Sequence, residues 1–232
     1  MSKTQQLAQK VIYIRGRSSF TQEEIANKLG VSRQSWILVE KGQRDLNTEE
    51  LKKLSEIFGV DIVDFFKETP NIDKFKQMYF ACIRLAADEQ GGIPKTKLAK
   101  LLYLVDFSNF FYSLESMSGI KYRRMQYGPV AEAFFSLTED FYEGGEINIQ
   151  PVSEALIISA TTQEQATDKL KPKELKLIKT ICSLWKNKRT MEIVNFTHQQ
   201  KPWKMCREGE YIPYELIIQE DPEHVYQPFT RQ

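Results

Sequence analysis

The chain has 232 residues, of which 27% are charged and 41% hydrophobic, and its formal net charge is +1. This balance is ordinary for a folded globular protein, and it excludes the strongly basic or acidic proteins whose bulk charge identifies a partner. The length suits one large domain or two smaller ones, and we expect two.

The basic residues are concentrated near the N-terminal end. Residues 1–44 contain eight Lys or Arg and three acidic residues, whereas residues 45–70 contain three basic and seven acidic residues. Such a basic block is typical of a phosphate-binding face, because each neutralised phosphate releases a counterion. Chance clustering on a solvated surface is the alternative.

The few cysteines and histidines argue against a metal site. Cys82, Cys182 and Cys206 are far apart, none lies in a C-x-x-C pair, and the chain has two histidines. We therefore expect no metal and no cofactor, and the unpaired cysteines favour a reducing compartment. The N-terminus has no apolar run of signal-peptide length, and no window approaches a membrane span. We expect a cytoplasmic protein.

Residues 20–58 carry clear helix boundaries. Thr21 and Glu24 form the pattern of a capping box, which predicts a helix start, and Gly30 supplies the left-handed turn that follows. Ser32 predicts the start of a second helix, whose inward side carries Trp36 and Val39. Asn47 begins a further capping box, and residues 7–17 predict an upstream helix. We expect a bundle of five short helices over residues 1–68.

The run TQEEIANKLGVSRQSWILVEKG resembles the XRE, or Cro/repressor-type, helix-turn-helix family, and the resemblance covers residues 7–66. It implies that the second helix enters the DNA major groove by its N-terminal end. Gln and Arg side chains can each form two hydrogen bonds to a base. The implied contacts to phosphates and bases are Gln22, Arg33, Gln34, Ser35, Lys41 and Arg44.

The second helix departs from the family pattern after its first turn. The family commonly has a mid-sized aliphatic residue at Trp36 and polar residues at Ile37 and Leu38. We expect Trp36 to face inward and the other two to face outward. The exposed pair suggests contact with thymine methyl groups, a dimer mate or another domain. A degenerate motif kept for dimerisation or docking is the alternative to DNA binding.

Residues 69–74 are expected to form a hinge, because Pro70 disfavours helix at Thr69. A second domain is expected over residues 75–232. A helix that begins near Pro94 is apolar on almost every side, so it belongs at the centre of this domain. Asp106 lies inside this apolar stretch and should find a cationic partner or a backbone amide, with a catalytic role as the alternative.

The segment KYRRMQY interleaves basic and aromatic residues, which suits nucleic-acid contact, an edge strand or a protein-binding loop. Gly128 and Pro129 after it predict a helix start. Residues 146–162 suit a β-hairpin, and the proline-rich tail from Gly209 suits extended chain. The predicted fold class is mainly α: a small five-helix bundle with a helix-turn-helix, followed by a larger helical domain with a short β-hairpin or β-ribbon.

The pieces KLLY at 100–103, YGPV at 127–130 and PW at 202–203 resemble the Panacea domain, an antitoxin-associated module of bacteria and phages. The resemblance covers roughly residues 73–210. It implies an antitoxin that neutralises a cognate protein toxin of unknown class by direct binding and represses its own operon. The candidate motif positions are Asp106, Gly128, Pro129, His198, Pro202 and Trp203, and the candidate toxin contacts are Tyr122, Arg123, Arg124 and Tyr127.

Two other functions are weighed against this one. A phage or stress transcriptional regulator would use its second domain to sense a ligand or to recruit a protein, with no toxin. An enzyme is not expected, because the sequence has no Ser/His/Asp elbow, no Gly-rich phosphate loop and no clustered acids. His198 and Trp203 suit structural roles in a core. The expected partners are a protein toxin and double-stranded operator DNA bound by a homodimer, without a membrane.

Overall fold

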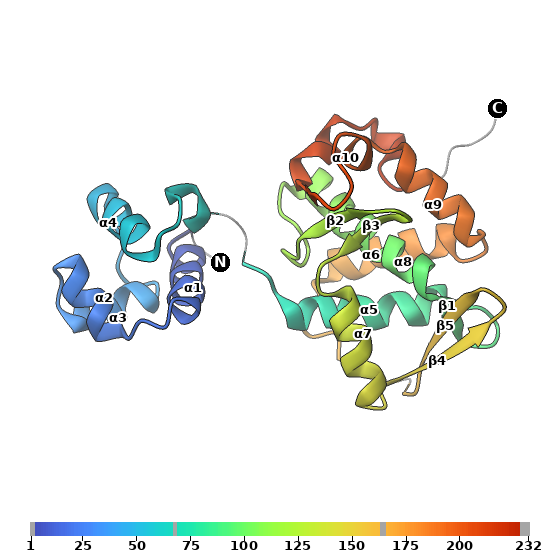
Figure 1. The fold of residues 1–232 in the computed structure, drawn as a ribbon, viewed down its shortest axis with the longest axis horizontal. Helices are drawn as coiled ribbons and strands as arrows, with labels where there is room; N and C mark the ends of the chain where they lie inside the picture. The colour runs from blue at the N-terminus through green and yellow to red at the C-terminus, as the bar shows by residue number, and fades with distance from the viewer. Residues whose placement is uncertain (1–2, 67–68, 163–165, 228–232) are drawn as a thin grey trace. The chain divides into compact units, whose positions relative to one another are not determined.

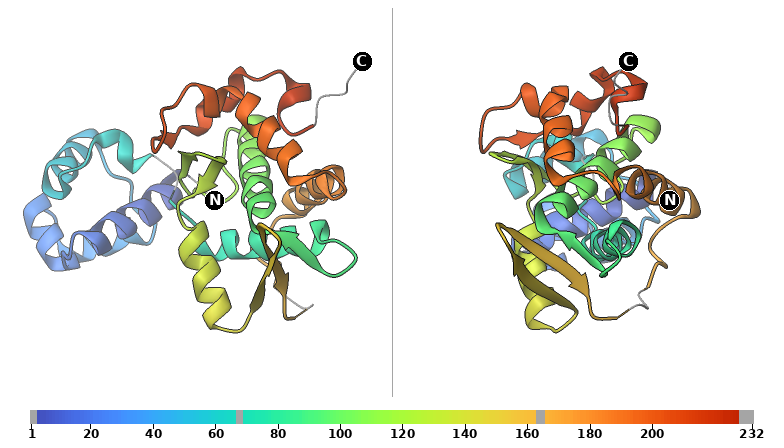
Figure 2. Two further views of the ribbon diagram at one scale, coloured as in Figure 1. Left: turned by 45° about the vertical axis from the view of Figure 1, so that its right-hand side comes forward. Right: turned by 90° about the vertical axis from the view of Figure 1, so that its right-hand side faces the viewer.

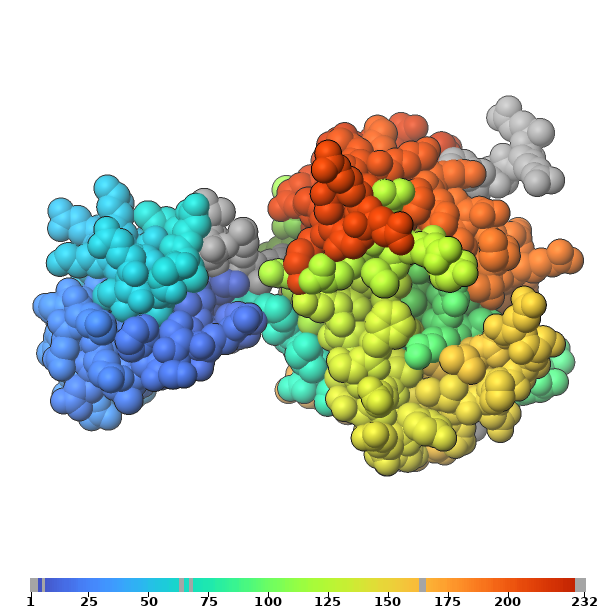
Figure 3. Space-filling model, viewed as in Figure 1, coloured from blue at the N-terminus to red at the C-terminus, as the bar shows by residue number. Residues whose placement is uncertain are grey.

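The computed structural model describes residues 3–66, 69–162 and 166–227. The chain forms two compact units, Met1–Thr69 and Pro70–Gln232, and each is described by itself (Figures 1 and 3). Each unit has its own hydrophobic core.

Unit 1 is a small helical bundle. Its helices are α1 (Lys3–Arg17), α2 (Gln22–Leu29), α3 (Arg33–Glu40), α4 (Thr48–Phe58) and the 3-10 helix η1 (Ile62–Phe65). The expected bundle is thus confirmed, with a 3-10 turn as its fifth helix. Trp36, Ile25 and Leu54 are fully buried at its centre, as the inward position predicted for Trp36 requires.

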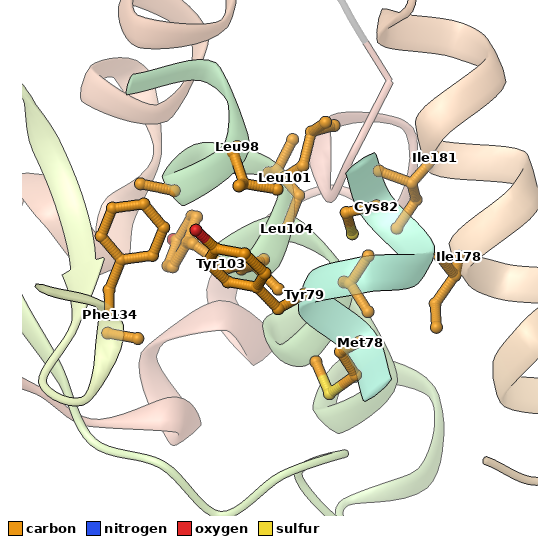
Figure 4. Close-up of a cluster of buried hydrophobic side chains, with 14 of the residues drawn as sticks. Met78, Tyr79, Cys82, Leu98, Leu101, Tyr103, Leu104, Phe134, Ile178 and Ile181 are labelled. Carbon is orange, nitrogen blue, oxygen red and sulfur yellow. The ribbon is translucent and has the colours of Figure 1, made fainter. Parts of the chain in front are cut away.

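Unit 2 is mainly helical and is built around α6. Its helices are α5 (Ile72–Ala86), α6 (Lys95–Ser113), α7 (Phe134–Glu143), α8 (Pro172–Trp185), α9 (Thr190–Gln199) and α10 (Lys201–Lys204), with the 3-10 helices η2 (Tyr214–Gln219) and η3 (Pro222–His224). Every residue of α6 from Lys97 to Asn109 is buried, as expected for a helix apolar on all sides. Figure 4 shows side chains of α5, α6 and α8 meeting in this core, among them Cys82, Leu101 and Ile181.

Two three-stranded antiparallel sheets complete unit 2. The first has the order β1-β5-β4, from β1 (Gly92–Pro94), β4 (Ile147–Val152) and β5 (Ala155–Ala160). Its β4–β5 hairpin confirms the predicted one and pairs Ile149 with Ile158. The second has the order β3-β2-β6, from β2 (Tyr122–Met125), β3 (Gly128–Ala131) and β6 (Tyr211–Ile212). The two sheets lie apart from one another within unit 2 in Figures 1 and 2.

The helix predicted at Gly128 and Pro129 is wrong, because these residues begin strand β3 and the helix α7 starts only at Phe134. Pro129 lacks a backbone N–H, and it is tolerated here because β3 is an edge strand of its sheet. The segment KYRRMQY contributes β2, which is the central strand of that sheet rather than an edge.

The tail from Gly209 also differs from the prediction of extended chain. It forms the short strand β6 and then the 3-10 helices η2 and η3. Each of these helices begins at or just after a proline and ends without becoming an α-helix. Ile217 and Val225 in this tail are fully buried, so packing on the domain core holds the segment in place.

The segment predicted as a hinge, residues 69–74, contains the start of α5 at Ile72. Asn71 caps this helix, since its side-chain oxygen accepts a hydrogen bond from the N–H of Lys74 at 2.9 Å. The predicted domain boundary at residue 68 and the predicted end of the second domain at residues 228–232 lie outside the described residues.

Across residues 3–66, 69–162 and 166–227, no three His, Cys, Asp or Glu side chains gather in a group that could hold a metal ion. None of the helices in these ranges has the length and apolar character needed to cross a membrane.

Candidate functional sites

Helix capping sets the geometry of the helix-turn-helix in unit 1. Thr21 and Glu24 form the predicted capping box at the start of α2, and Gly30 ends the helix with a φ of 81°. Ser32 then caps α3, since its side chain accepts a hydrogen bond from the N–H of Ser35 at 3.1 Å. Because these bonds join residues three apart, the turn between α2 and α3 follows directly from local sequence.

The N-terminal turn of α3 presents polar side chains at the surface. Arg33 and Gln34 are exposed, and Ser35 is half-buried beside the cap, where its hydroxyl accepts a hydrogen bond from Ser32 Oγ at 2.9 Å. Within the described residues, the side chains of Arg33 and Gln34 make no hydrogen bond or ion pair. Both side chains can therefore reach a ligand without first breaking an internal contact.

Glu40, which the sequence analysis did not single out, connects three helices of unit 1. Its carboxylate binds Arg15 of α1, with 2.5 Å between Arg15 Nε and Glu40 Oε1. It also accepts hydrogen bonds from Gln22 Nε2 at 2.6 Å and from Trp36 Nε1 at 3.0 Å. The side-chain amide nitrogen of Gln22, a predicted phosphate contact, is thus engaged inside the unit. The sequence did contain a signal for this role, because Glu40 is the acidic residue that directly follows the apolar run of residues 36–39.

The two basic residues predicted after α3 differ in their environment. Lys41 is exposed. Arg44 instead forms an ion pair with Glu50 of α4, with 2.5 Å between Arg44 Nη2 and Glu50 Oε1. The carboxylate neutralises this guanidinium, so contact between Arg44 and a phosphate would require the pair to open or to be shared.

The apolar pair on α3 points partly to solvent, as expected from its position. Leu38 is 38% exposed and Ile37 is half-buried. Their environment inside unit 1 is compatible with each of the three predicted contacts, namely thymine methyl groups, a dimer mate or another domain.

In unit 2, the separate motif pieces come together at one place. Lys100 of α6 donates a hydrogen bond from Nζ to the carbonyl oxygen of Pro129 at 3.0 Å. A Cβ atom built on Gly128 would lie 2.8 Å from Lys100 Cε and 2.9 Å from Thr197 Oγ1, so α6, β3 and α9 meet at this glycine. The site therefore has room only for glycine. The φ of 97° at Gly128 also favours glycine, because residues with a Cβ rarely adopt a positive φ.

Lys100 is buried to an unusual degree for a cationic side chain. Only 1% of the residue is exposed, and within the described residues no carboxylate lies in ion-pair distance of its ammonium group. Burial therefore lowers the pKa of Lys100 to about 7. Burial thus favours the neutral amine inside the motif that joins α6 to the β2–β3 turn.

Trp203 lies between two cationic or titratable groups. The ring of His198 stacks on it, with 4.1 Å between ring centroids and 15° between planes, and Arg124 Cζ lies 3.9 Å from its ring centroid. Burial, together with the charges of Lys100 and Arg124, lowers the pKa of His198. The neutral imidazole is thus favoured, and this stack fixes α10 against the β2–β3 sheet.

The surface beside this stack combines aromatic, methionine and arginine side chains. Tyr127, in the β2–β3 turn, is 62% exposed, and Met125 and Tyr211 are exposed nearby on the same sheet. Arg123 lies over the Tyr211 ring, with its Cζ 3.9 Å from the ring centroid. Figure 3 shows the β2–β3 segment and the chain that follows α10 side by side on one face. This composition is typical of protein-binding surfaces.

Tyr122 does not belong to that surface. It is fully buried, and its hydroxyl donates to the carbonyl oxygen of Leu102 at 3.1 Å and lies 3.2 Å from Asp106 Oδ2. The alternation of a β-strand sends Tyr122 into the core and leaves Arg123 at the surface. Only Arg123, Arg124 and Tyr127 of the predicted toxin contacts are therefore available to a partner.

Asp106 is bound by backbone amides, which was one of the two kinds of partner expected for a charged residue in an apolar helix. Its carboxylate accepts hydrogen bonds from the N–H groups of Met117 at 2.7 Å and Ser118 at 3.0 Å, and from the Ser118 hydroxyl. Burial raises the pKa of this carboxyl, and the hydrogen bonds from Ser118 and Met117 oppose that rise. Asp106 thereby anchors the loop between α6 and β2, which is a structural task.

Comparison with known families finds two matches, one that covers most of unit 1 and one that lies within unit 2. Residues 9–77 match a helix-turn-helix domain family, and residues 98–204 match the family described as antitoxin SocA-like, Panacea domain. Neither family is an enzyme family.

Two curated relatives match part of the chain. An uncharacterized HTH-type transcriptional regulator of Methanocaldococcus jannaschii is 46% identical over 57 residues, which are 25% of this chain and 86% of the relative. The cryptic phage CTXphi transcriptional repressor RstR of Vibrio cholerae is 32% identical over 66 residues, which are 28% of this chain and 60% of the relative. No solved structure matches.

These findings support a DNA-binding antitoxin or regulator. By its N-terminal unit the chain belongs to the helix-turn-helix transcriptional regulators, and its second unit carries an antitoxin SocA-like, Panacea domain.

Proposed function

We propose that the chain is a cytoplasmic type II antitoxin, which neutralises a cognate protein toxin by direct binding and represses its own operon. Unit 2 binds the toxin and unit 1 binds the operator. The observation that carries the proposal is the convergence of Lys100, Gly128, His198 and Trp203 within a Panacea domain, beside a surface that contains the half-buried Arg123 and the exposed Tyr127.

The toxin contact is assigned to the surface formed by Arg123, Arg124, Met125, Tyr127 and Tyr211. Exposed Tyr and Arg side chains supply much of the binding energy in protein interfaces. The core beneath supports them, because Arg124 is held against Trp203 and donates from Nη1 to the carbonyl oxygen of Cys206 at 2.7 Å. A rigid surface of this kind loses little side-chain entropy when a partner binds.

Operator binding is assigned to the N-terminal turn of α3. Arg33 and Gln34 are exposed there, with side chains suited to guanine and adenine, and Lys41 follows the helix. We expect a homodimer that places two α3 helices about 34–36 Å apart on a palindrome. The similarity to a transcriptional repressor of the CTXphi phage supports the repression part of the proposal.

Growth of cells that express an adjacent gene tests the proposal. Expression of the toxin gene alone should arrest growth, and co-expression of this chain should restore it. The variant Tyr127→Ala should lose this rescue, whereas Tyr142→Ala, which removes another exposed tyrosine of unit 2 on α7, should keep it. If neither adjacent gene arrests growth, neutralisation is ruled out, and operator binding without it would indicate a transcriptional regulator.

A further inference from the structure

A strongly basic surface lies on and beside α8 of unit 2. Residues 166–190 contain eight Lys or Arg and two acidic residues. All eight basic residues are exposed. We call them the α8 basic surface; they are Lys169, Lys171, Lys173, Lys176, Lys179, Lys186, Lys188 and Arg189.

The placement of these lysines follows from the helical period. Ile178, Ile181 and Trp185 are buried on the side of α8 that packs on the core. Because successive residues turn by about 100°, Lys176 projects directly away from these residues, and Lys173 and Lys179 flank it. Lys173 and Lys186 are separated by about 20 Å along the axis at about 1.5 Å per residue. The surface is therefore an extended stripe of charge.

The acidic residues of this region leave most of the charge uncompensated. Glu174 is buried, where it accepts from Lys74 Nζ at 2.7 Å and caps α8 through the N–H of Lys171. Among the described residues, Asp168 forms an ion pair with Lys169, and the α9 residue Glu192 forms one with Lys188. Within the described residues, Lys173, Lys176, Lys179 and Lys186 have no acidic side chain within ion-pair distance.

We propose that the α8 basic surface binds the phosphate backbone of duplex DNA as a second contact, independent of base recognition by α3. Protein interfaces are depleted in lysine, whereas phosphate contacts favour it. Aromatic side chains that could stack unpaired bases are absent from the exposed part of residues 166–190 that the structure describes, so the surface favours a duplex over a single strand. The chemistry is that of a positioning contact, without sequence preference.

Such a contact would act through the covalent connection to unit 1. A chain that already holds DNA by one unit presents its second unit at high local concentration, which raises the affinity for the same duplex without new base contacts. Counterion release then makes the added affinity depend strongly on salt.

The test compares two triple variants of the full chain. Lys173→Gln/Lys176→Gln/Lys179→Gln neutralises the stripe, and Lys121→Gln/Lys204→Gln/Arg207→Gln removes three exposed charges elsewhere in unit 2. Fluorescence anisotropy measures the affinity for a 30-base-pair duplex of random sequence between 50 and 200 mM salt. Circular dichroism confirms that both variants are folded.

The α8 variant should bind about tenfold or more weakly at low salt, and the slope of log affinity against log salt should fall by about 2.7, at about 0.9 per lost phosphate contact. The other variant should keep both values. Equal loss in the two variants, or an unchanged slope in the α8 variant, overturns the proposal. Stronger binding to single-stranded DNA or duplex RNA than to duplex DNA also overturns it.

An operator-contact variant separates this inference from the proposed function. Arg33→Ala should weaken preference for the operator over random duplex, while the salt dependence that the α8 lysines contribute persists. Rescue from the toxin is a separate readout, so loss of neutralisation in cells would leave the α8 result unchanged.

Discussion

Replacement of Gly128 by alanine tests how tightly the Panacea motif is packed. The added Cβ would lie 2.8 Å from Lys100 Cε and 2.9 Å from Thr197 Oγ1. Lys100 is 1% exposed and Thr197 is fully buried, so neither side chain can move aside into solvent. Overpacking of this kind costs about 1–3 kcal/mol, and a left-handed backbone at a residue with a Cβ costs about 1–2 kcal/mol more. We expect Gly128→Ala to lower the unfolding free energy of unit 2 by about 2–5 kcal/mol.

Gly145→Ala is the matched control in the same unit. Gly145 also has a positive φ, of 70°, but no atom lies within 4 Å of its added Cβ. Backbone strain alone should therefore lower stability by about 1–2 kcal/mol. Native-state hydrogen exchange read by mass spectrometry reports unit 2 through peptides of α6 and unit 1 through peptides of α2 to α4. Equal destabilisation by the two substitutions would refute the packing argument, and unit 1 should be unaffected by either.

Three further predictions concern buried charge and DNA contact. Because burial lowers the pKa of Lys100 to about 7, the folded state releases its proton before the unfolded state does, so unit 2 should gain up to about 1.4 kcal/mol of stability per pH unit between pH 7 and 9.5. Urea unfolding of the chain and of Lys100→Met over this range checks it, and an undiminished pH slope in the variant would contradict it. Glu40→Gln should lower the stability of unit 1 by about 3 kcal/mol, because it leaves a guanidinium of the bundle without its carboxylate, whereas the exposed Glu23→Gln should change it by less than about 0.5 kcal/mol. The double variant Arg33→Ala/Gln34→Ala should bind the operator about tenfold or more weakly while growth rescue persists, and simultaneous loss of both activities would show that the two units do not act separately.

The α8 basic surface and the charge asymmetry of residues 1–44 illustrate different kinds of sequence information. A basic block beside a helix-turn-helix pattern pointed to phosphate contact at once. The lysines of α8 are equally visible in the sequence, but whether their charge is neutralised depends on where Glu174 lies. The carboxylate of Glu174 is buried, where it binds Lys74 and accepts a hydrogen bond from the N–H of Lys171 at the helix start. Only the tertiary structure shows that acidic side chains do not neutralise most of the positive charge along α8.

Local signals determined much of unit 1. The capping boxes at Thr21 and Asn47 and the cap at Ser32 join residues three apart, so the chain needs no distant partner to form them. The 3.6-residue period likewise placed Trp36 inside the bundle and the helix from Lys95 at the centre of unit 2.

Contacts between distant residues were decided by the tertiary structure. A Gly-Pro pair suits a helix start or an edge strand, and pairing with β2 over the buried Lys100 selected the strand. The partners of Glu40 lie up to 25 residues away, and Arg124 and Trp203 are 79 positions apart in the chain. Helix caps and helical periodicity depend on residues a few positions apart, so they can be predicted from the sequence. Contacts between distant segments depend on which apolar surfaces pack together and exclude water, and this is determined only when the whole core has assembled.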